Sequence, residues 1–79
     1  MIDKILGERQ DQYGDAEYNF VAIGRIWGAL LRIEDIEPHK VGLMMDALKT
    51  VRAFQNPEHK DSWDDKEGYI KEIRKFLGI

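Results

Sequence analysis

The sequence predicts an all-α fold, a compact bundle of about four short helices in a single domain that covers residues 1–79. Apolar residues recur at the i, i+3, i+4, i+7 spacing of a helix face along much of the chain. β-branched residues are sparse and do not alternate with polar residues, so strand signals are weak. Gly14, Pro38 and Pro57 divide the chain into pieces of helical length.

The first two expected helices cover residues 2–12 and about 16–32. Gly14 suits the stop of the first helix, and Asp15 suits the N-cap of the second. Gly24 and Gly28 each cost about 1 kcal/mol against alanine in a helix interior, so we expect another helix to approach closely there. The apolar residues expected to be buried are Ile2, Ile5 and Leu6 in the first helix, and Phe20, Ile23, Trp27, Leu30 and Leu31 in the second.

The third and fourth expected helices cover residues 38–55 and about 62–77. Pro38 fits the first turn of the third helix, and Asn56 and Pro57 end it. The short connection "QNPEHK" favours antiparallel packing of these two helices. The residues expected to face inward are Val41, Met44, Met45, Leu48 and Val51 in the third helix, and Trp63, Ile70, Ile73 and Leu77 in the fourth.

Composition limits the class of protein. Apolar residues make up 43% of the chain and charged residues 34%, a globular balance, and the absence of cysteine excludes disulfides and zinc–thiolate sites. The first ten residues mix charged and apolar side chains, and no apolar run approaches the roughly 20 residues of a membrane span, so we expect a cytoplasmic protein. The net charge of −3, with scattered basic residues, argues against binding of a nucleic-acid polymer.

Self-association is expected because so short a chain has a thin core. At this size folding buries only about 60% of the surface that the unfolded chain exposes. The glycines of the second expected helix and the methionines of the third are the predicted contacts of a homo-oligomer. The alternative is a marginally stable monomer.

The stretch "NPEHKDSWDDKEGY", residues 56–69, concentrates the candidate functional groups. In a helix that begins near Ser62, the residues Asp61, Asp65, Gly68 and Glu72 share one face. Lys49 and Arg52 share a face of the preceding helix, so antiparallel packing can bring both sets together. Lys and Arg bind phosphate oxygens, and two or three carboxylates could hold Mg²⁺. His59 could donate a proton or a hydrogen bond.

Each of these features also has a purely structural interpretation. Asp61 or Ser62 could cap the helix, since "SWDD" matches the capping-box pattern. Lys49 and Arg52 could be solvated or paired with Asp46. Trp27 and Trp63 are more often core residues than stacking platforms, whereas Tyr13 and Tyr69 could belong to either class.

The motifs R-x-x-x-Y-G-D, N-F, K-x-x-R and H-x-D-S-W-x-D-x-x-G-Y follow one another from Arg9 to Tyr69. In this order they resemble an uncharacterised family of small phage and prophage proteins, which implies the cytoplasm of a bacterial host. More distantly, the arrangement is similar to MazG-like all-α nucleoside triphosphate pyrophosphohydrolases.

The distant resemblance implies roles for individual residues. Asp61 and Asp65 would face a magnesium ion, with Glu58 as a third carboxylate. The residues implied for the phosphate and the rest of the ligand pocket are Lys49, Arg52, His59, Tyr13, Asn19 and Tyr69. The chain departs from the MazG pattern at residues 46–52, where "DALKTVR" replaces an E-x-x-E pair. Half of the usual magnesium cage is therefore absent or replaced by positive charge.

These observations lead to one hypothesis and two alternatives. The leading hypothesis is a phage-type protein that binds a nucleotide or a nucleotide-derived phosphate ligand and so sequesters nucleotide immune signals. The first alternative is a magnesium-dependent pyrophosphohydrolase that cleaves a nucleoside triphosphate between its α and β phosphates. The second is a helical protein–protein interaction module, marked by an exposed apolar patch. Whether the chain is an enzyme stays open.

Overall fold

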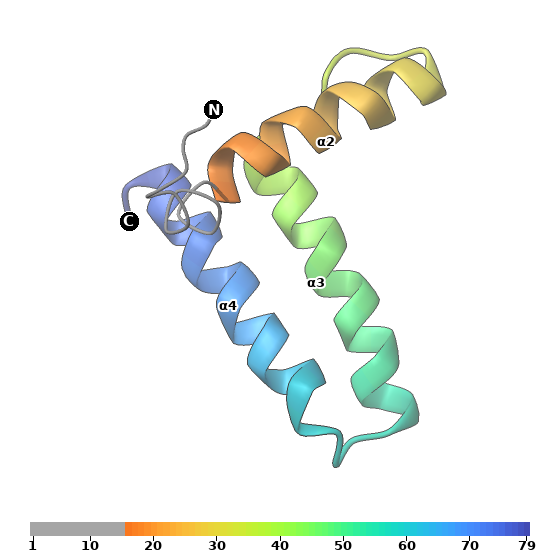
Figure 1. Ribbon diagram of the computed structural model, residues 1–79, viewed down its shortest axis with the longest axis vertical. Helices are drawn as coiled ribbons and strands as arrows, with labels where there is room; N and C mark the ends of the chain where they lie inside the picture. The colour runs from red at the N-terminus through yellow and green to blue at the C-terminus, as the bar shows by residue number, and fades with distance from the viewer. Residues whose placement is uncertain (1–15) are drawn as a thin grey trace, which may run out of the picture.

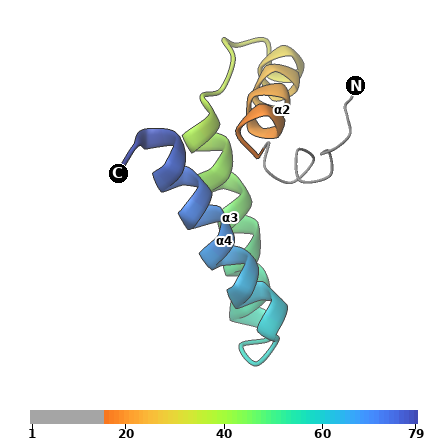
Figure 2. The ribbon, with the colours of Figure 1, turned by 60° about the vertical axis from the view of Figure 1, so that its left-hand side comes forward.

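The computed structural model describes residues 16–79, and within this range it contains helices and no strand. The helices are α2 (Ala16–Leu31), α3 (Pro38–Gln55) and α4 (Lys60–Leu77). α3 and α4 lie side by side and antiparallel, and α2 crosses the end of this pair that is remote from the α3–α4 connection (Figures 1 and 2). The all-α prediction is confirmed. The expected helix 2–12 and Tyr13 lie outside the described residues.

The boundaries of α2 and α3 agree with the sequence prediction to within one residue. Pro38 occupies the first turn of α3 after Glu37, whose backbone is extended. The N–H of Asn56 donates to the carbonyl of Arg52 at 2.9 Å and closes the last turn of this helix. Proline at the start and an X-Pro pair at the end therefore define α3 locally.

The start of α4 differs from the prediction. The helix begins at Lys60, and its N-cap is His59, which makes no side-chain capping hydrogen bond. The N–H of His59 donates to the carbonyl of Asn56 at 3.1 Å, so the turn after α3 leads directly into the new helix. Ser62 lies inside α4 and is buried. The interpretation of Asp61 or Ser62 as the N-cap is therefore wrong.

Gly24 and Gly28 are buried against the connection between α2 and α3. A Cβ atom at Gly24 would clash with the carbonyl oxygen of Ile36, and one at Gly28 would lie 2.6 Å from the carbonyl oxygen of Glu34. The N–H of Ile36 also donates to the carbonyl of Gly24 at 3.2 Å. The close approach is confirmed, but its partner is the chain's own connection. The prediction of another helix, or of a second copy, at these glycines is wrong.

The core runs between α3 and α4, and α2 adds to it at the end remote from the α3–α4 connection. Its buried apolar side chains are Phe20, Val41, Ala53 and Ile73. The Phe20 ring from α2 meets Phe76 edge to face, with 5.4 Å between ring centroids. Gly42 leaves room on α3 for Ile73, because a Cβ there would lie 2.6 Å from its Cγ1 atom. The Phe20 ring thus packs α2 against the α3–α4 pair.

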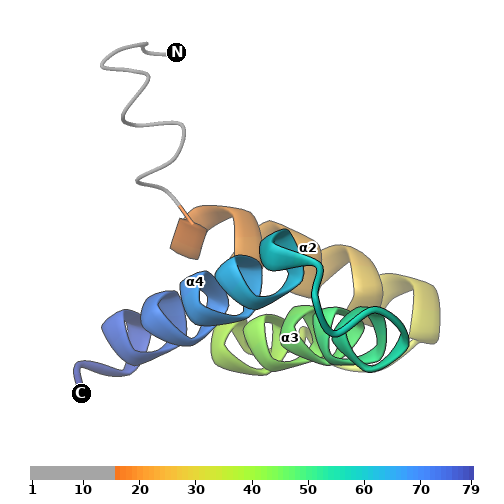
Figure 3. The same ribbon diagram turned by 90° about the horizontal axis from the view of Figure 1, so that it is seen from below.

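Several residues predicted to be buried are at least two-fifths exposed: Leu30, Leu31, Met44, Leu48, Val51, Trp63, Ile70 and Leu77. The prediction is wrong for these residues and right for Phe20, Val41 and Ile73. Figure 3 shows the reason, since α2 lies on one side of the α3–α4 pair. Apolar periodicity marks a stripe on each helix, but the described helices cover only part of it.

Candidate functional site

The α3–α4 pair presents two sides, which differ in their relation to α2. We call the side that faces α2 the α2 side. Its residues are Lys49, Arg52, Asp65, Tyr69 and Glu72. We call the opposite side the open side. Its residues are Asp46, Thr50, Phe54, Trp63, Lys66 and Ile70.

An ion pair joins the two helices on the α2 side. The Lys49 ammonium lies 2.9 Å from a carboxylate oxygen of Asp65, with side-chain exposures of 20% and 46%. Antiparallel packing therefore does bring the two predicted charged sets together. Asp46, the structural partner considered for Lys49, binds Lys66 instead.

A first hollow of about 380 Å³ lies at the loop end of the α2 side. Its lining residues are Arg52, Gln55, Asn56, His59 and Ser62. Each of these side chains can donate a hydrogen bond, and none is a carboxylate. His59 Nδ1 and Ser62 Oγ lie 3.2 Å apart, so the imidazole is held against the buried Ser62 in the first turn of α4. This hollow, the donor hollow, is suited to an anion.

A second hollow of about 370 Å³ lies where α2 meets α4. Its lining residues are Ala16, Asn19, Phe20, Asp64, Asp65, Gly68, Tyr69 and Glu72. Two of the residues predicted to bind the ligand, Asn19 and Tyr69, come together here with three carboxylates. Ser62 and Tyr69, one from each hollow, lie about 10 Å apart along α4 at 1.5 Å per residue. We call this second hollow the acidic hollow.

The predicted metal ligands do not converge within the described part of the chain. Glu58 lies exposed in the connection, Asp61 lies exposed in the first turn of α4, and Asp65 is bound by Lys49. Among residues 16–79, no group of three or more His, Asp or Glu side chains could hold a metal ion. One chain's described residues therefore supply no cluster of three ligands, and magnesium binding stays a prediction.

One further ion pair lies in the first turns of α4. The Lys60 ammonium donates to Asp64 at 2.6 Å, and this hydrogen bond raises the pKa of Lys60. Lys60 therefore offsets the charge of Asp64, one of the three carboxylates that line the acidic hollow. Both side chains are more than half exposed, so the pair adds little to stability.

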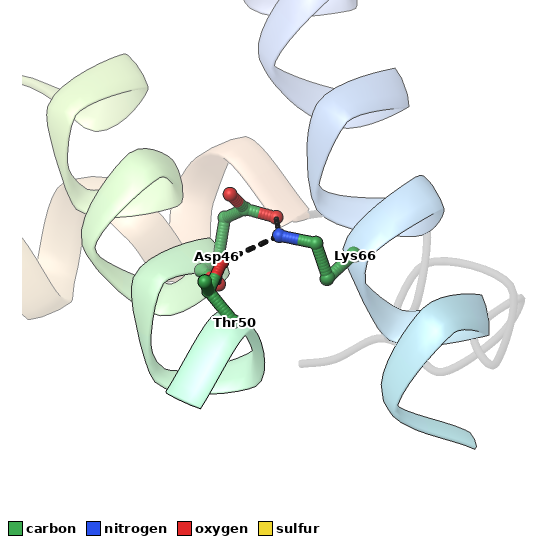
Figure 4. A network of polar contacts seen from close by, with 3 residues as sticks. All are labelled: Asp46, Thr50 and Lys66. Carbon is green, nitrogen blue, oxygen red and sulfur yellow. Dashed lines mark hydrogen bonds and ion pairs between the residues drawn. The ribbon is translucent and has the colours of Figure 1, made fainter. Parts of the chain in front are cut away.

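On the open side, Lys66 bridges the helices through a network that the sequence interpretation missed (Figure 4). Its ammonium donates to Asp46 at 2.9 Å and to the Thr50 hydroxyl at 2.6 Å. The Lys66 and Asp46 side chains are only 22% and 18% exposed. Asp46 and Thr50 lie one turn apart on α3, a spacing that could have indicated a shared partner on α4.

The rest of the open side is largely apolar. A hollow of about 810 Å³ is lined by Trp63, Ile70 and Ile79 together with charged residues of α4. A neighbouring hollow of about 430 Å³ is lined in part by Phe54, a side chain that is 89% exposed. The Trp63 indole N–H donates to the Pro57 carbonyl at 2.7 Å, which holds the ring at the loop end of the open side.

Among residues 16–79, no helix is both long enough and apolar enough to cross a bilayer.

Comparison with known proteins identifies the family. The chain is 38% identical over 72 residues to the Gene 55 protein of Mycobacterium phage L5, across 91% of this chain and 46% of that protein. It thus spans less than half the length of this curated relative. No solved structure matches the chain. The prediction of a phage protein family is confirmed, whereas the MazG-like resemblance stays a prediction. Residues 2–75 match the family described as "Domain of unknown function (DUF6378)", and the chain belongs to this family.

Proposed function

We propose that the chain binds a nucleotide-type phosphorylated ligand on the α2 side, with a phosphate group in the donor hollow. One observation carries this proposal: Arg52 and His59 line the same hollow among amide and hydroxyl groups, with no carboxylate in the lining. A planar guanidinium can donate two parallel hydrogen bonds to one phosphate group. The positive end of the α4 dipole adds to the attraction for an anion.

The acidic hollow supports a nucleotide over a simple phosphate ion. Carboxylates of Asp65 and Glu72 can accept hydrogen bonds from sugar hydroxyls, and Tyr69 offers an aromatic ring next to them. A ligand along α4 that reached both hollows would pass the Lys49–Asp65 ion pair. Lys49 is engaged by Asp65, so the proposal gives the main phosphate contacts to Arg52 and His59.

Binding without turnover is the form of this function that we propose. A protein that withholds nucleotide immune signals from a bacterial host needs affinity and no chemical step. The alternative, a magnesium-dependent pyrophosphohydrolase, requires carboxylates around one ion, and one chain's described residues do not supply that cluster. A binding protein would leave the nucleotide intact, whereas a pyrophosphohydrolase would cleave it.

Calorimetric titration tests the proposal directly. The parent chain is titrated with nucleoside triphosphates, cyclic nucleotides and inorganic phosphate, each with and without Mg²⁺, and the ligand is then analysed by chromatography. We expect heat with at least one nucleotide, which is recovered unchanged. Arg52→Gln should weaken that binding at least tenfold, because the bidentate contact is lost. His59→Asn, which keeps a good N-cap residue, should weaken it less.

Arg25→Gln is the matched control. It removes the same charge from an exposed arginine on α2, whose only described partner is Asp35 at 3.7 Å. Its affinity for the nucleotide should equal that of the parent chain. Release of pyrophosphate would favour the enzyme instead. If no nucleotide binds, or if Arg25→Gln and Arg52→Gln weaken binding equally, the donor hollow is not the site.

A second candidate function, protein–protein interaction, is favoured by a different observation. The open side exposes apolar side chains of both helices, with Phe54, Trp63 and Ile70 among them. Exposed apolar clusters of this kind mark protein interaction surfaces. This candidate does not compete with ligand binding, because the two surfaces lie on opposite sides of the α3–α4 pair.

A further inference from the structure

We propose that the open side is covered by the open side of a second copy of this chain, with the two α4 helices antiparallel across a two-fold axis near Ile70. This inference does not depend on the proposed function, since it uses neither the donor hollow nor the acidic hollow. Of the contacts predicted from the sequence, Gly24 and Gly28 are buried inside the chain, whereas the methionines of α3 stay a prediction that this surface does not use.

The open side has the character of an uncovered helix–helix interface. Trp63 and Ile70 lie seven residues apart on one face of α4, and Phe54 lies beside them on α3. Each of these three side chains is more than two-fifths exposed. A pair of helices that packs on one side only buries its other apolar face when a further helix pair completes a four-helix arrangement.

The positive charge of Lys66, which lies beneath this surface, is already neutralised within the chain. The Lys66 ammonium is satisfied by Asp46 and Thr50, so a partner need not bring an opposite charge to that point (Figure 4). A buried lysine without this network would exclude an apolar partner. The network therefore allows apolar side chains of another helix to pack over it.

Two charged residues of α4 in the large hollow, Glu67 and Arg74, are self-complementary about Ile70. Glu67 comes before Ile70 in the large hollow, and Arg74 comes after it. An axis that passes between Ile70 and Lys71 places Glu67 opposite the partner's Arg74, and the symmetry of the pair creates the same contact a second time. In a parallel two-fold arrangement each of these residues would lie opposite the same residue of the second copy, so that like charges would meet. Between these two residues, the antiparallel direction is therefore the favourable one for a second copy.

The shapes at the two ends of α4 also match in this register. The same axis places Trp63 opposite the partner's Gly78, which closes α4 in the left-handed conformation with a φ of 72°. No atom of the described part of the chain lies within 4 Å of a Cβ built at Gly78, so these residues leave that end of the hollow open. A large indole therefore meets the smallest residue, next to the apolar side chain of the partner's Ile79.

A charge exchange tests the register. Sedimentation equilibrium of the full chain over a range of concentrations should give a dimer. Glu67→Arg alone and Arg74→Glu alone should each raise the dimer dissociation constant by roughly tenfold, since each places like charges opposite one another at two symmetric points. The double variant Glu67→Arg, Arg74→Glu restores opposite charges in the antiparallel register. Its dissociation constant should return to within about threefold of the parent value.

Two matched lysine substitutions test the surface. Ile70→Lys should shift the chain to monomer, whereas Leu48→Lys, at a similarly exposed position of α3 that lines neither hollow of the open side, should leave the dimer intact. Circular dichroism of both variants should retain the helical content, because neither side chain belongs to the buried core.

Three results would overturn the inference. A parent chain that stays monomeric at millimolar concentration has no second copy on the open side. If Leu48→Lys dissociated the dimer and Ile70→Lys had no effect, the dimer contact would lie around Leu48 on α3. A double charge variant that is no tighter than either single variant would exclude the antiparallel register.

Discussion

The two sides of the α3–α4 pair carry similar ion pairs in different surroundings. Lys49–Asp65 on the α2 side and Lys66–Asp46 on the open side each join the helices at 2.9 Å. The first lies between two polar hollows, and its carboxylate is about half exposed. The second lies under apolar side chains and is about four-fifths buried. The same kind of ion pair thus lies at a solvated surface on one side and beside an apolar surface on the other.

The largest effect should separate two isoleucines one turn apart on α4. Ile73 is 7% exposed in the core, and Ile70 is 41% exposed on the open side. Ile73→Ala should lower the free energy of unfolding by about 2–5 kcal/mol, because it removes buried methyl groups and leaves a cavity. Ile70→Ala should cost less than about 1 kcal/mol at concentrations where the chain is monomeric. Urea unfolding measures both values.

Repeating the unfolding of Ile70→Ala and Ile73→Ala at several protein concentrations separates the two residues further. The cost of Ile70→Ala should grow as concentration rises, because the residue then contributes through the dimer and binding adds to apparent stability. The cost of Ile73→Ala should stay constant. Equal costs for both variants in dilute solution would contradict the distinction between core and open side.

A second, smaller effect concerns the glycines that decide how α2 is held. Gly24→Ala should destabilise the chain by about 1–3 kcal/mol, since the new methyl group would clash with the backbone carbonyl of Ile36. Gly68→Ala is the control on α4, with nothing within 4 Å of the added atom. It should stabilise the chain by about 0.5–1 kcal/mol, the usual gain of alanine over glycine in a helix.

Thermal unfolding followed by circular dichroism measures both glycine variants. If Gly24→Ala were neutral, the α2–α3 connection would not lie against α2 as described, and the distinction between the α2 side and the open side would weaken. A loss of stability in Gly68→Ala would indicate a contact at the acidic hollow that residues 16–79 of one chain do not provide.

The smallest effect compares the two ion pairs themselves. Lys66→Met should cost about 1–2 kcal/mol, because it leaves the carboxylate of Asp46 mostly buried without its donor. Lys49→Met should cost less than about 1 kcal/mol, since water reaches Asp65. Double-mutant cycles with Asp46→Asn and Asp65→Asn isolate the two pair energies. The comparison fails if the Lys49–Asp65 pair is the stronger one.

Local signals in the sequence were sufficient to predict α3. Proline at its start and the Asn56–Pro57 pair at its end act on their immediate neighbours, so no tertiary information was needed. The start of α4 was missed because the tight turn from Asn56 to His59 selects an N-cap without a capping side chain. Ser62, with the more favourable capping chemistry, is used in the interior instead.

Burial was harder to predict because it depends on what covers each stripe. The pattern of Trp63, Ile70 and Leu77 is that of a core face, but α2 packs on the opposite side of α4. The glycine spacing in α2 correctly indicated a close approach and could not reveal that a loop makes it.

The candidate site was predicted in part. Lys49 and Asp65 were expected to meet because their helices are antiparallel and each belongs to a charged face, and the structure brings them together. The expectation for Asp46 failed because a lysine 20 positions away on α4 is a better partner than one within the same helix. The other predicted ligand residues are divided between two hollows in place of a single pocket, whereas Glu58 and Asp61 line neither hollow and Tyr13 lies outside the described range.

The hydrogen bond from the Trp63 indole to the Pro57 carbonyl has a spectroscopic consequence. The chain contains two tryptophans, Trp27 in α2 and Trp63 at the loop end of the open side. In a Trp27→Phe background, all indole emission would come from Trp63, whose ring is about half in contact with water. The wavelength of the emission maximum would then report, without any added label, whether the surface around Trp63 is exposed to water or covered.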